Sequence, residues 1–347
     1  MKLIGRPHAR IALAAVVVAM TIGAGAAYAA RQATKTASIG TGIVVVNTNL
    51  AYQNGQAAGT GMVLTSSGEI LTNNHVIAGA TTIKVVVPGT THRYTGRVVG
   101  YSVAKDVAVI QLANASNLKT VSTANSSALT VGAKVTAVGN AGGGGKLTSS
   151  TGTVTGLGKS IAVQDDSGGT EQLSNLIETN AGLQPGDSGG PLLNSTGRVV
   201  GMDTAGSVGG GRFAAYAASD GYAIPINDAL AIAKQIEAGS ASTLVHIGAT
   251  PFLGVGVESV GSSPFEDTGA TSGLVIANVV SGGAADNAGL ATSDVITAVD
   301  GKAVSAQSDL QSILLAHKPG DKITIAYSDS YGQAQTVTVT LGSGPAQ

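Results

Sequence analysis

The chain has 347 residues, of which 43% are hydrophobic and 11% are charged, and it contains 50 glycines and no cysteine. This length predicts two to three domains rather than one small core. The formal net charge of -1 gives no electrostatic reason to expect a nucleic-acid partner. The absence of cysteine excludes disulfides, thiol chemistry and cysteine-based zinc sites. Few charges and many Gly, Ser, Thr and Val residues predict a mostly β protein with many turns.

Residues 1–30 have the pattern of an export signal. Three basic residues precede an uncharged stretch, residues 11–30, and Ala27-Tyr28-Ala29 has the small-x-small form of a cleavage site. The alternative is an uncleaved membrane anchor, because about 20 apolar residues can just span a bilayer. In either case we expect the remainder to be secreted or to lie in the extracytoplasmic cell envelope, with membrane contact only through this segment.

Short β-branched runs separated by turns then follow one another, which predicts closed barrels or a sandwich. A first set comprises residues 42–47, 59–64, 70–77, 82–87, 93–99 and 107–112, and a second set comprises residues 134–139, 150–157, 160–164, 176–180, 198–203 and 222–226. The hairpin ending at residue 77 places His75 at the end of its second strand. A helix is predicted over residues 229–238, capped by Asn227-Asp228 and stopped by Gly239.

Residues 239–250 have linker composition, and a compact unit of about 90 residues, a normal domain size, begins at Phe252. Asp300-Gly301 predicts a hairpin turn, and the spacing of Ser308 and Gln311 predicts a capping box that opens a helix. The predicted strands of this unit are residues 252–257, 274–280, 294–296, 322–327 and 334–341, and the predicted helices are residues 284–287 and 308–316.

Residues 186–191 (GDSGGP) are the stretch most typical of catalysis. The glycines around Ser188 permit positive φ and a tight turn that displays its hydroxyl group. The same turn would direct the N–H groups of Gly186 and Ser188 toward one point, where a carbonyl oxygen that gains negative charge is stabilised. The alternative is an ordinary glycine-rich turn before a strand.

A serine nucleophile needs a base within hydrogen-bond reach, usually a histidine that a carboxylate orients. Of the five histidines, only His75 and His92 share the double β unit with Ser188, and His92 lies in a polar turn where we expect it to be solvated. We therefore predict that His75 is the base, although a lone histidine at a strand end is more often structural.

For the orienting carboxylate we predict Asp106, which stands at the start of the apolar strand 107–112. Its alternative is an ordinary aspartate at a strand start. Asp165 and Asp166 lie in a Ser/Gly turn, and Asp187 adjoins the nucleophile with its side chain pointing away.

The order His75, Asp106, Ser188 and the motifs TNNHV, KDVAVI and GDSGGPL resemble the chymotrypsin-fold serine proteases, and within them the HtrA (DegP-like) family. That family appends PDZ domains. The C-terminal unit looks like such a domain, because it contains FLGV at residues 252–255, GL at 289–290, DVI at 294–296 and PGD at 319–321. The resemblance covers roughly residues 40–341. It implies a mostly β fold, in which a chymotrypsin-like double six-stranded antiparallel β-barrel, with the triad in the cleft between the barrels, is followed by a PDZ-like α+β domain.

In this sequence the resemblance implies a protease domain over residues 38–238, with barrels over about 38–125 and 126–238. A linker, residues 239–250, and a PDZ domain, residues 251–342, complete the chain. Asn180-Ala181 stands where family members often have Asp-Ala, and Ser293 stands where a glycine is usual. A homo-oligomer is possible, but trimeric members use N-terminal aromatic contacts, and this segment has few aromatic residues.

The resemblance also implies a substrate pocket. In chymotrypsin-like proteases the side chain before the scissile bond enters a pocket whose floor lies a few residues upstream of the serine, here at Gly182. The opposite wall is expected at residues 202–206, where strand alternation puts Asp203 and Thr204 on opposite faces and leaves open which one points inward. If Thr204 does, we expect cleavage after small or medium aliphatic residues.

In a PDZ-like domain the N–H groups of Leu253, Gly254 and Val255 would bind a C-terminal carboxylate, while the peptide adds a strand beside residues 255–258. Leu310 and Leu314 lie four apart on the predicted helix and could line the pocket for the last residue of the peptide. The alternative for these leucines is core packing, which we expect for one of the two.

Two classes of function follow from these observations. The first is an exported serine endopeptidase that acts on unfolded or misfolded proteins, needs no metal or cofactor, and uses a PDZ domain to bind protein C-termini. The second is a non-hydrolytic chaperone or adaptor that binds unfolded chains. The presence of all three triad residue types in one chain favours the first.

Overall fold

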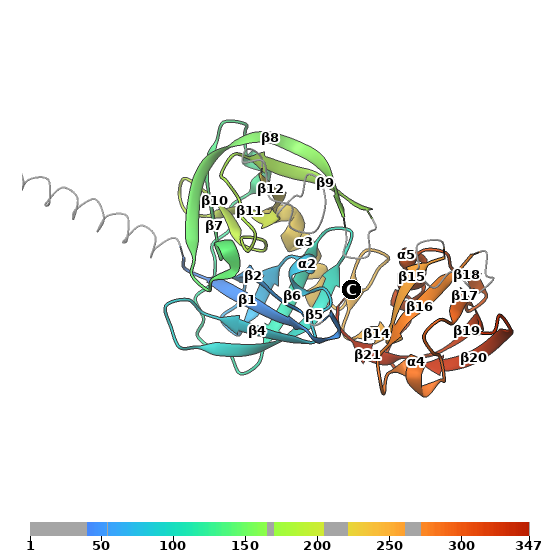
Figure 1. Cartoon of the computed structure of the whole chain (residues 1–347). Helices are drawn as coiled ribbons and strands as arrows, with labels where there is room; N and C mark the ends of the chain where they lie inside the picture. The colour runs from blue at the N-terminus through green and yellow to red at the C-terminus, as the bar shows by residue number, and fades with distance from the viewer. Residues whose placement is uncertain (1–39, 54, 165–169, 205–220, 261–271, 347) are drawn as a thin grey trace, which may run out of the picture. The chain divides into compact units, whose positions relative to one another are not determined.

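The computed structural model describes residues 40–53, 55–164, 170–204, 221–260 and 272–346 (Figure 1). The expected export signal lies outside these residues, and so do Asp165 and Asp166. No helix within the described ranges is long and apolar enough to cross a membrane.

Six antiparallel strands form the first barrel (Figure 1, blue to cyan). They are β1 (Ile43–Leu50), β2 (Gly55–Val63), β3 (Glu69–Thr72), β4 (Thr82–Val86), β5 (Arg93–Ser102) and β6 (Val107–Leu112). The strands pair in the order β5-β4-β1-β2-β3-β6, and the pairing of β5 with β6 closes the sheet. β-branched residues such as Val44, Val46 and Ile110 alternate into its core, because successive side chains of a strand point to opposite faces.

The second barrel also has six strands and is closed in the order β10-β11-β12-β9-β8-β7 (Figure 1, green to yellow). They are β7 (Lys134–Gly139), β8 (Thr148–Gln164), β9 (Thr170–Thr179), β10 (Pro191–Asn194), β11 (Val199–Thr204) and β12 (Gly221–Pro225). Its core includes Ala137, Ile177 and Leu192. The two 3-10 turns η2 (Ser126–Ala128) and η3 (Ala141–Gly143) flank β7. The two barrels confirm the prediction of a double six-stranded fold.

Helix α3 (Ile226–Glu237) follows β12 and buries Ile226, Ala229, Ala233 and Ile236. It begins three residues before the predicted start, so the prediction that Asn227-Asp228 caps it was wrong. The Asn227 side chain is instead used in a tertiary contact, since its Nδ2 donates to Asn125 Oδ1 at 2.7 Å. Burial of Ile226 in the first turn explains why the helix starts directly after Pro225.

The C-terminal unit is a six-stranded sheet with two helices. Its strands are β15 (Val255–Ser259), β16 (Leu274–Val279), β17 (Val295–Val299), β18 (Lys302–Ala303), β19 (Lys322–Ser328) and β20 (Ala334–Thr340), and its helices are α4 (Ala284–Asn287) and α5 (Gln307–Leu315). The order is β15-β16-β17-β19-β20, with β18 paired to β17, so β15 is an edge strand. The predicted hairpin turn is confirmed, because Asp300 and Gly301 both have positive φ between paired residues.

Two details of this part of the chain differ from expectation. Helix α5 is preceded by Ala306, whose N–H donates to Asp309 Oδ2 at 2.9 Å, so Asp309 and not Gln311 closes the first turn. The segment predicted as a linker contains β13 (His246–Ile247), which pairs with β5, and the start of β14 (Thr250–Phe252), which pairs with β21 (Gly342–Gly344).

Candidate active site

Strand β3 ends at Thr72, and His75 lies on α2 (Asn74–Ile77), a single helical turn that follows it. The prediction that His75 ends a strand was therefore wrong. The turn is fixed by Val76 and Ile77, which are buried in the core of the first barrel. The His75 side chain remains 30% exposed and is accessible to a substrate.

The imidazole of His75 and the carboxylate of Asp106 are hydrogen-bonded. His75 Nδ1 lies 3.0 Å from Oδ1 and 2.9 Å from Oδ2 of Asp106, and the His75 backbone N–H donates to Oδ1 at 3.0 Å. Asp106 directly precedes β6 and has a φ of 50°, a left-handed conformation that aspartate tolerates better than most residues. A proton on Nδ1 leaves Nε2 unprotonated and able to act as a base.

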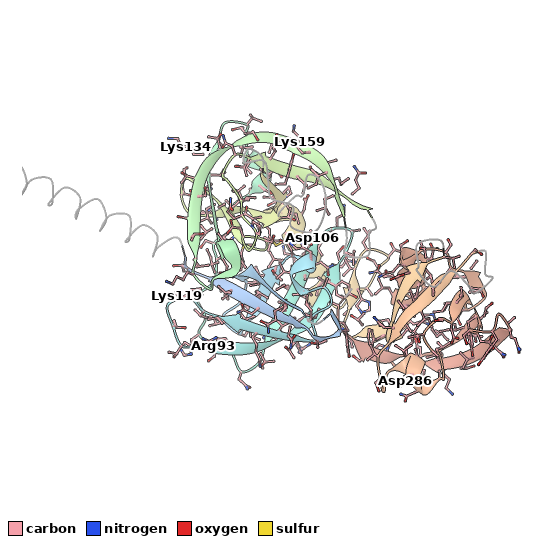
Figure 2. The ribbon with its side chains drawn as sticks, viewed as in Figure 1. Arg93, Asp106, Lys119, Lys134, Lys159 and Asp286 are labelled. Atoms are coloured by element: carbon pink, nitrogen blue, oxygen red, sulfur yellow. The ribbon has the colours of Figure 1, made fainter. Side chains whose placement is uncertain are left out.

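Two further side chains hold Asp106 in place. Thr204 Oγ1 donates to Asp106 Oδ2 at 2.9 Å, and Asn73 Nδ2 donates to the Asp106 carbonyl oxygen at 2.9 Å. Because Thr204 ends β11 of the second barrel and Asn73 follows β3 of the first, both barrels orient Asp106, which is labelled in Figure 2. Sequence reasoning did not find either contact, since strand alternation alone left the direction of Thr204 open.

Ser188 lies at the tip of the glycine-rich loop between β9 and β10 and is 5% exposed. Gly186 has a φ of 99°, and a Cβ at this position would collide with the Asn140 carbonyl oxygen, so only glycine fits. No hydrogen bond joins the Ser188 hydroxyl to His75 in the described ranges. Catalytic hydrogen bonds of this kind are often long without a substrate and tighten when one binds.

Two amides of the nucleophile loop are free in the described residues. The other N–H groups donate within the protein: Asp187 to Gln184 at 3.0 Å, Gly189 to Asp203 at 2.8 Å and Gly190 to Asp187 at 2.8 Å. The N–H groups of Gly186 and Ser188 have no acceptor there, and these are the two amides that the sequence predicts for an oxyanion hole. A buried N–H group without an acceptor is uncommon and is costly unless a ligand supplies one.

Two carboxylates are buried behind the nucleophile loop. Among the described residues, neither oxygen of Asp203 has a hydrogen-bond partner, and Asp187 uses only Oδ2, which accepts the Gln184 N–H at 2.9 Å. Burial raises the pKa of Asp187, although the Gln184 hydrogen bond opposes this. Burial raises the pKa of Asp203 well above its usual value, and the nearby Asp187 charge raises it further. The protein interior therefore favours the protonated form of Asp203.

The residues expected in the substrate pocket are placed as follows. Gly182 is exposed, with a φ of 65°, and the nearest atom to a Cβ there would be Ser150 Oγ at 3.4 Å. The direction of Thr204 was left open by the sequence, and its hydroxyl is directed to Asp106, so its place in the pocket stays a prediction. Asp203 pairs with Ala223, a core residue of the second barrel, so its side chain faces the barrel interior. The remainder of the expected wall, from residue 205, lies outside the described residues, and Gly182 stays a prediction.

The loop expected to bind a peptide terminus has free donors. The N–H groups of Leu253 and Gly254 donate to no acceptor within the described ranges, and Gly254 has a φ of 83°. Val255 begins the edge strand β15. Leu310 and Leu314 are both buried in the core of this unit, with partly buried Val255 and Val257 packed against the same cluster. The role of these residues in peptide binding stays a prediction.

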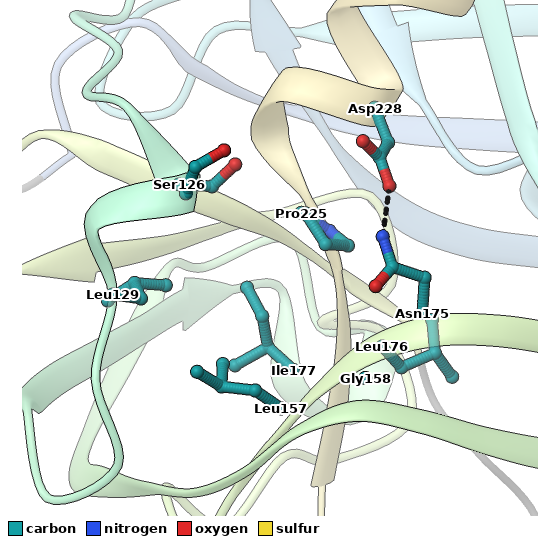
Figure 3. Close-up of a pocket in the computed structure, with 10 residues that line it drawn as sticks. Ser126, Leu129, Leu157, Gly158, Asn175, Leu176, Ile177, Pro225 and Asp228 are labelled. Atoms are coloured by element: carbon teal, nitrogen blue, oxygen red, sulfur yellow. Dashed lines mark hydrogen bonds between the residues drawn. The ribbon is translucent and has the colours of Figure 1, made fainter.

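A separate cavity of about 190 Å³ lies in the second barrel between η2, the β8–β9 hairpin and the start of α3 (Figure 3). Leu129, Leu176 and Ile177 line it, and at its edge Asn175 Nδ2 donates to Asp228 Oδ2 at 2.7 Å.

The described residues contain no group of three or more His, Asp or Glu side chains that could hold a metal ion.

Comparison with known proteins agrees with this geometry. Residues 59–202 match the family model of the trypsin-like peptidase domain, and residues 251–341 match that of the PDZ domain. The chain is 32% identical to the serine protease Do-like HtrA of Lactococcus lactis over 295 residues, which cover 82% of this chain and 70% of that protein. The chain belongs to the HtrA family of serine proteases. The predicted PDZ-like domain and the family resemblance are thereby confirmed.

Other serine proteases show a similar identity to this chain. The chain is 32% identical to the serine protease PepD of Mycobacterium tuberculosis over 313 residues, which cover 86% of this chain but 63% of PepD. A match of 34% identity to the putative serine protease HhoB of Synechocystis covers 78% of this chain and likewise 63% of HhoB. A solved structure of an AlgW variant with a tripeptide, an HtrA-type protease, shares 27% identity over 89% of this chain and 95% of that one, with a TM-score of 0.50.

Proposed function

We propose that this protein is an exported serine endopeptidase that hydrolyses peptide bonds of unfolded or misfolded proteins through an acyl-enzyme. The observation that carries the proposal is the pairing of a buried Asp106 with His75 Nδ1, in a fold whose Ser188 and Gly186 N–H groups have no acceptor among the described residues. A buried carboxylate that orients a half-buried imidazole is the arrangement that serine nucleophiles require.

The chemistry assigns one role to each residue. His75 Nε2 removes the proton from the Ser188 hydroxyl as its oxygen attacks the peptide carbonyl carbon. The carbonyl oxygen becomes an oxyanion, which the N–H groups of Gly186 and Ser188 stabilise, and Asp106 stabilises the imidazolium that forms. The C–N bond then breaks, and the amine leaves with the proton from His75. Water, activated by the same imidazole, hydrolyses the ester.

Export is supported by the N-terminal pattern and by the relatives. A probable periplasmic serine endoprotease of the DegP-like type from Pseudomonas fulva is 32% identical to this chain, over 84% of this chain and 57% of that protein. These two observations support the proposal that this protein acts outside the cytoplasm. Unfolded chains are the proposed substrates because only an extended, accessible backbone can bring a peptide carbonyl to the Ser188 hydroxyl.

The PDZ domain is proposed to bind C-terminal peptides. The support is that β15 is an edge strand and that Leu253 and Gly254, directly before it, have free N–H groups. A peptide that adds a strand to β15 would bring its terminal carboxylate to these donors.

The experiment that tests the protease is hydrolysis of unfolded casein by the full chain and by its Ser188→Ala, His75→Ala and Asp106→Ala variants. Each variant should lose on the order of 10⁴ in turnover or more, because the three groups act as a unit. His92→Ala is the matched control, since His92 is exposed in the same barrel and should be dispensable. Binding of casein without any hydrolysis by the wild-type chain would instead identify the chaperone or adaptor function.

A further inference from the structure

Thr60 connects the first barrel to the nucleophile loop. It lies on β2, is completely buried, and bonds to the carbonyl oxygens of both residues whose N–H groups are free. Its hydroxyl donates to Gly186 O at 2.7 Å, and its backbone N–H donates to Ser188 O at 2.9 Å. These bonds span more than 120 positions in the sequence, so they depend entirely on the fold.

The Thr60 hydroxyl is used as an acceptor as well. It accepts the Asn140 N–H at 2.9 Å, and it therefore joins β2, the loop after β7 and the nucleophile loop at one oxygen atom. The Thr60 methyl group is also close to the loop, since Cγ2 would lie 3.1 Å from a Cβ at Gly190. The hydroxyl group and the methyl group of Thr60 thus both lie against the segment that carries Ser188.

These bonds bear on the direction of the free amides because each peptide group is planar. The peptide that carries the Gly186 N–H is anchored by Pro185 O, which accepts the Gly142 N–H at 2.8 Å. Thr60 fixes the next carbonyl group, Gly186 O, so the plane on either side of the Gly186 Cα is held. The Asp187 N–H of the same peptide group donates to Gln184 O at 3.0 Å, so loss of the Thr60 hydroxyl removes one of two restraints on Gly186, whose φ of 99° gives it the conformational freedom of glycine.

We infer that Thr60 is a positioning residue that holds the Gly186 N–H group toward the oxyanion of the transition state. The inference rests on the proposed function, in which this amide and that of Ser188 form the oxyanion hole. The bond to Gly186 O comes from the side chain of Thr60, outside the loop, and can be removed by substitution.

The test compares Thr60→Val, which keeps the shape but removes the hydroxyl, with Thr60→Ser, which keeps the hydroxyl. In casein hydrolysis we expect Thr60→Val to lower kcat about 10-fold to 100-fold, less than the loss from deleting an oxyanion donor outright, with KM changed less than about twofold. Thr60→Ser should stay within about threefold of the wild type. Thr48→Val is the matched control, because Thr48 is also buried in this barrel and, among the described residues, its hydroxyl bonds only to Ala57 O, at 3.3 Å.

A second measurement reports on the oxyanion directly. A peptide aldehyde built on a cleavage site sequenced from the casein digest adds to Ser188, and the resulting hemiacetal oxygen occupies the oxyanion position. Its inhibition constant should weaken in Thr60→Val by the same factor as kcat/KM, because both report transition-state complementarity. A variant that is only less stable would not change the two in parallel.

The outcomes separate this inference from the proposed function. Equal kcat/KM and equal aldehyde affinity in Thr60→Val and the wild type would overturn the positioning role. If Thr60→Val does not fold, the ratio between Thr60→Ser and Thr60→Ala isolates the hydroxyl, and a ratio of one would overturn the role as well. A wild-type chain that never cleaves casein would remove the proposed function and this inference with it.

Discussion

Thr204 Oγ1 donates a hydrogen bond of 2.9 Å to Asp106 Oδ2, and this bond joins the last residue of β11 to the residue before β6. Both side chains are buried. The same oxygen of Asp106 lies 2.9 Å from His75 Nδ1, so Thr204 and His75 contact one carboxylate oxygen from the two barrels. The orientation of the imidazole therefore depends on how the barrels are joined.

The first prediction is that Thr204→Val lowers kcat for casein by about 10-fold to 100-fold, because a hydrogen bond to a charged group contributes about 1.5–3 kcal/mol. KM should change little, since Thr204 orients Asp106 rather than binding substrate. Thr204→Ser should restore most of the activity. Thr179→Val is the control, as Thr179 is equally buried in the second barrel but its hydroxyl donates to Thr153 O and accepts the Ala181 N–H. Unchanged kinetics in Thr204→Val would show that His75 and the backbone suffice to hold Asp106.

The barrels were predictable because alternating apolar residues and glycine turns are local signals. The positions of His75 and Thr204 were not, because both depend on tertiary packing. A four-residue helix such as α2 is too short to show a helical periodicity in the sequence. This helix forms because Val76 and Ile77 are buried in the first barrel. Likewise, alternation shows that Asp203 and Thr204 point to opposite faces, but only the closed barrel shows which face contains Asp106.

The start of α3 was missed for a related reason. Asn and Asp are strong N-cap residues in isolation, so Asn227-Asp228 predicts the first turn. In the folded chain Asn227 bonds to Asn125, and this long-range contact outweighs a local preference of about 1 kcal/mol. The helix then begins where Ile226 can be buried.

The second prediction concerns pH and Asp203. Because burial raises its pKa in the folded state, the folded protein keeps a proton that the unfolded chain releases above about pH 4. The contribution of protonated Asp203 to the free energy of unfolding is complete below that pH and is lost as the pH rises through the folded-state pKa of Asp203. The melting temperature of the protease transition should thus fall between pH 5 and 8, as measured by calorimetry, and should fall less in Asp203→Asn, which cannot ionise.

Asp309→Asn is the control for this prediction, because backbone N–H groups of Ser305 and Ala306 lower the pKa of Asp309. Its contribution is present above about pH 4 and is lost only below it, so the slope between pH 5 and 8 should remain that of the wild type. Identical slopes in Asp203→Asn and the wild type would show that Asp203 is ionised in the folded protein despite its burial.

The third prediction is that the full chain, with Ser188→Ala to prevent hydrolysis, binds peptides that end in an apolar residue and a free carboxylate. The free N–H groups of Leu253 and Gly254 are the donors for that carboxylate. Amidation of the peptide C-terminus should weaken binding at least about tenfold, because a charged acceptor is replaced by a neutral one. Fluorescence anisotropy of labelled peptides measures this. Equal affinity for the amidated and free forms would exclude carboxylate recognition.

The last prediction is that the protease cleaves after small or medium aliphatic residues such as Val, Ala, Ile or Leu. Gly182 contributes no side chain at the expected floor, and Asp203, the one carboxylate expected near the wall, faces the barrel interior. Burial also favours the neutral form of Asp203, so it offers no charge to a basic side chain. An aliphatic side chain gains about 25 cal/mol per Å² on burial, whereas an unpaired Lys or Arg would lose its hydration without compensation.

Sequencing the fragments of digested casein measures this preference, with Ser188→Ala as the control for contaminating proteases. Gly182→Asp provides a gain-of-function arm, because aspartate tolerates the φ of 65° at this position and would place a carboxylate at the floor. We expect it to shift cleavage toward sites after Lys and Arg. A wild-type digest dominated by Lys or Arg before the cut would contradict the prediction, since it would require an ionised carboxylate in the pocket, and Asp203 would then have to reach it.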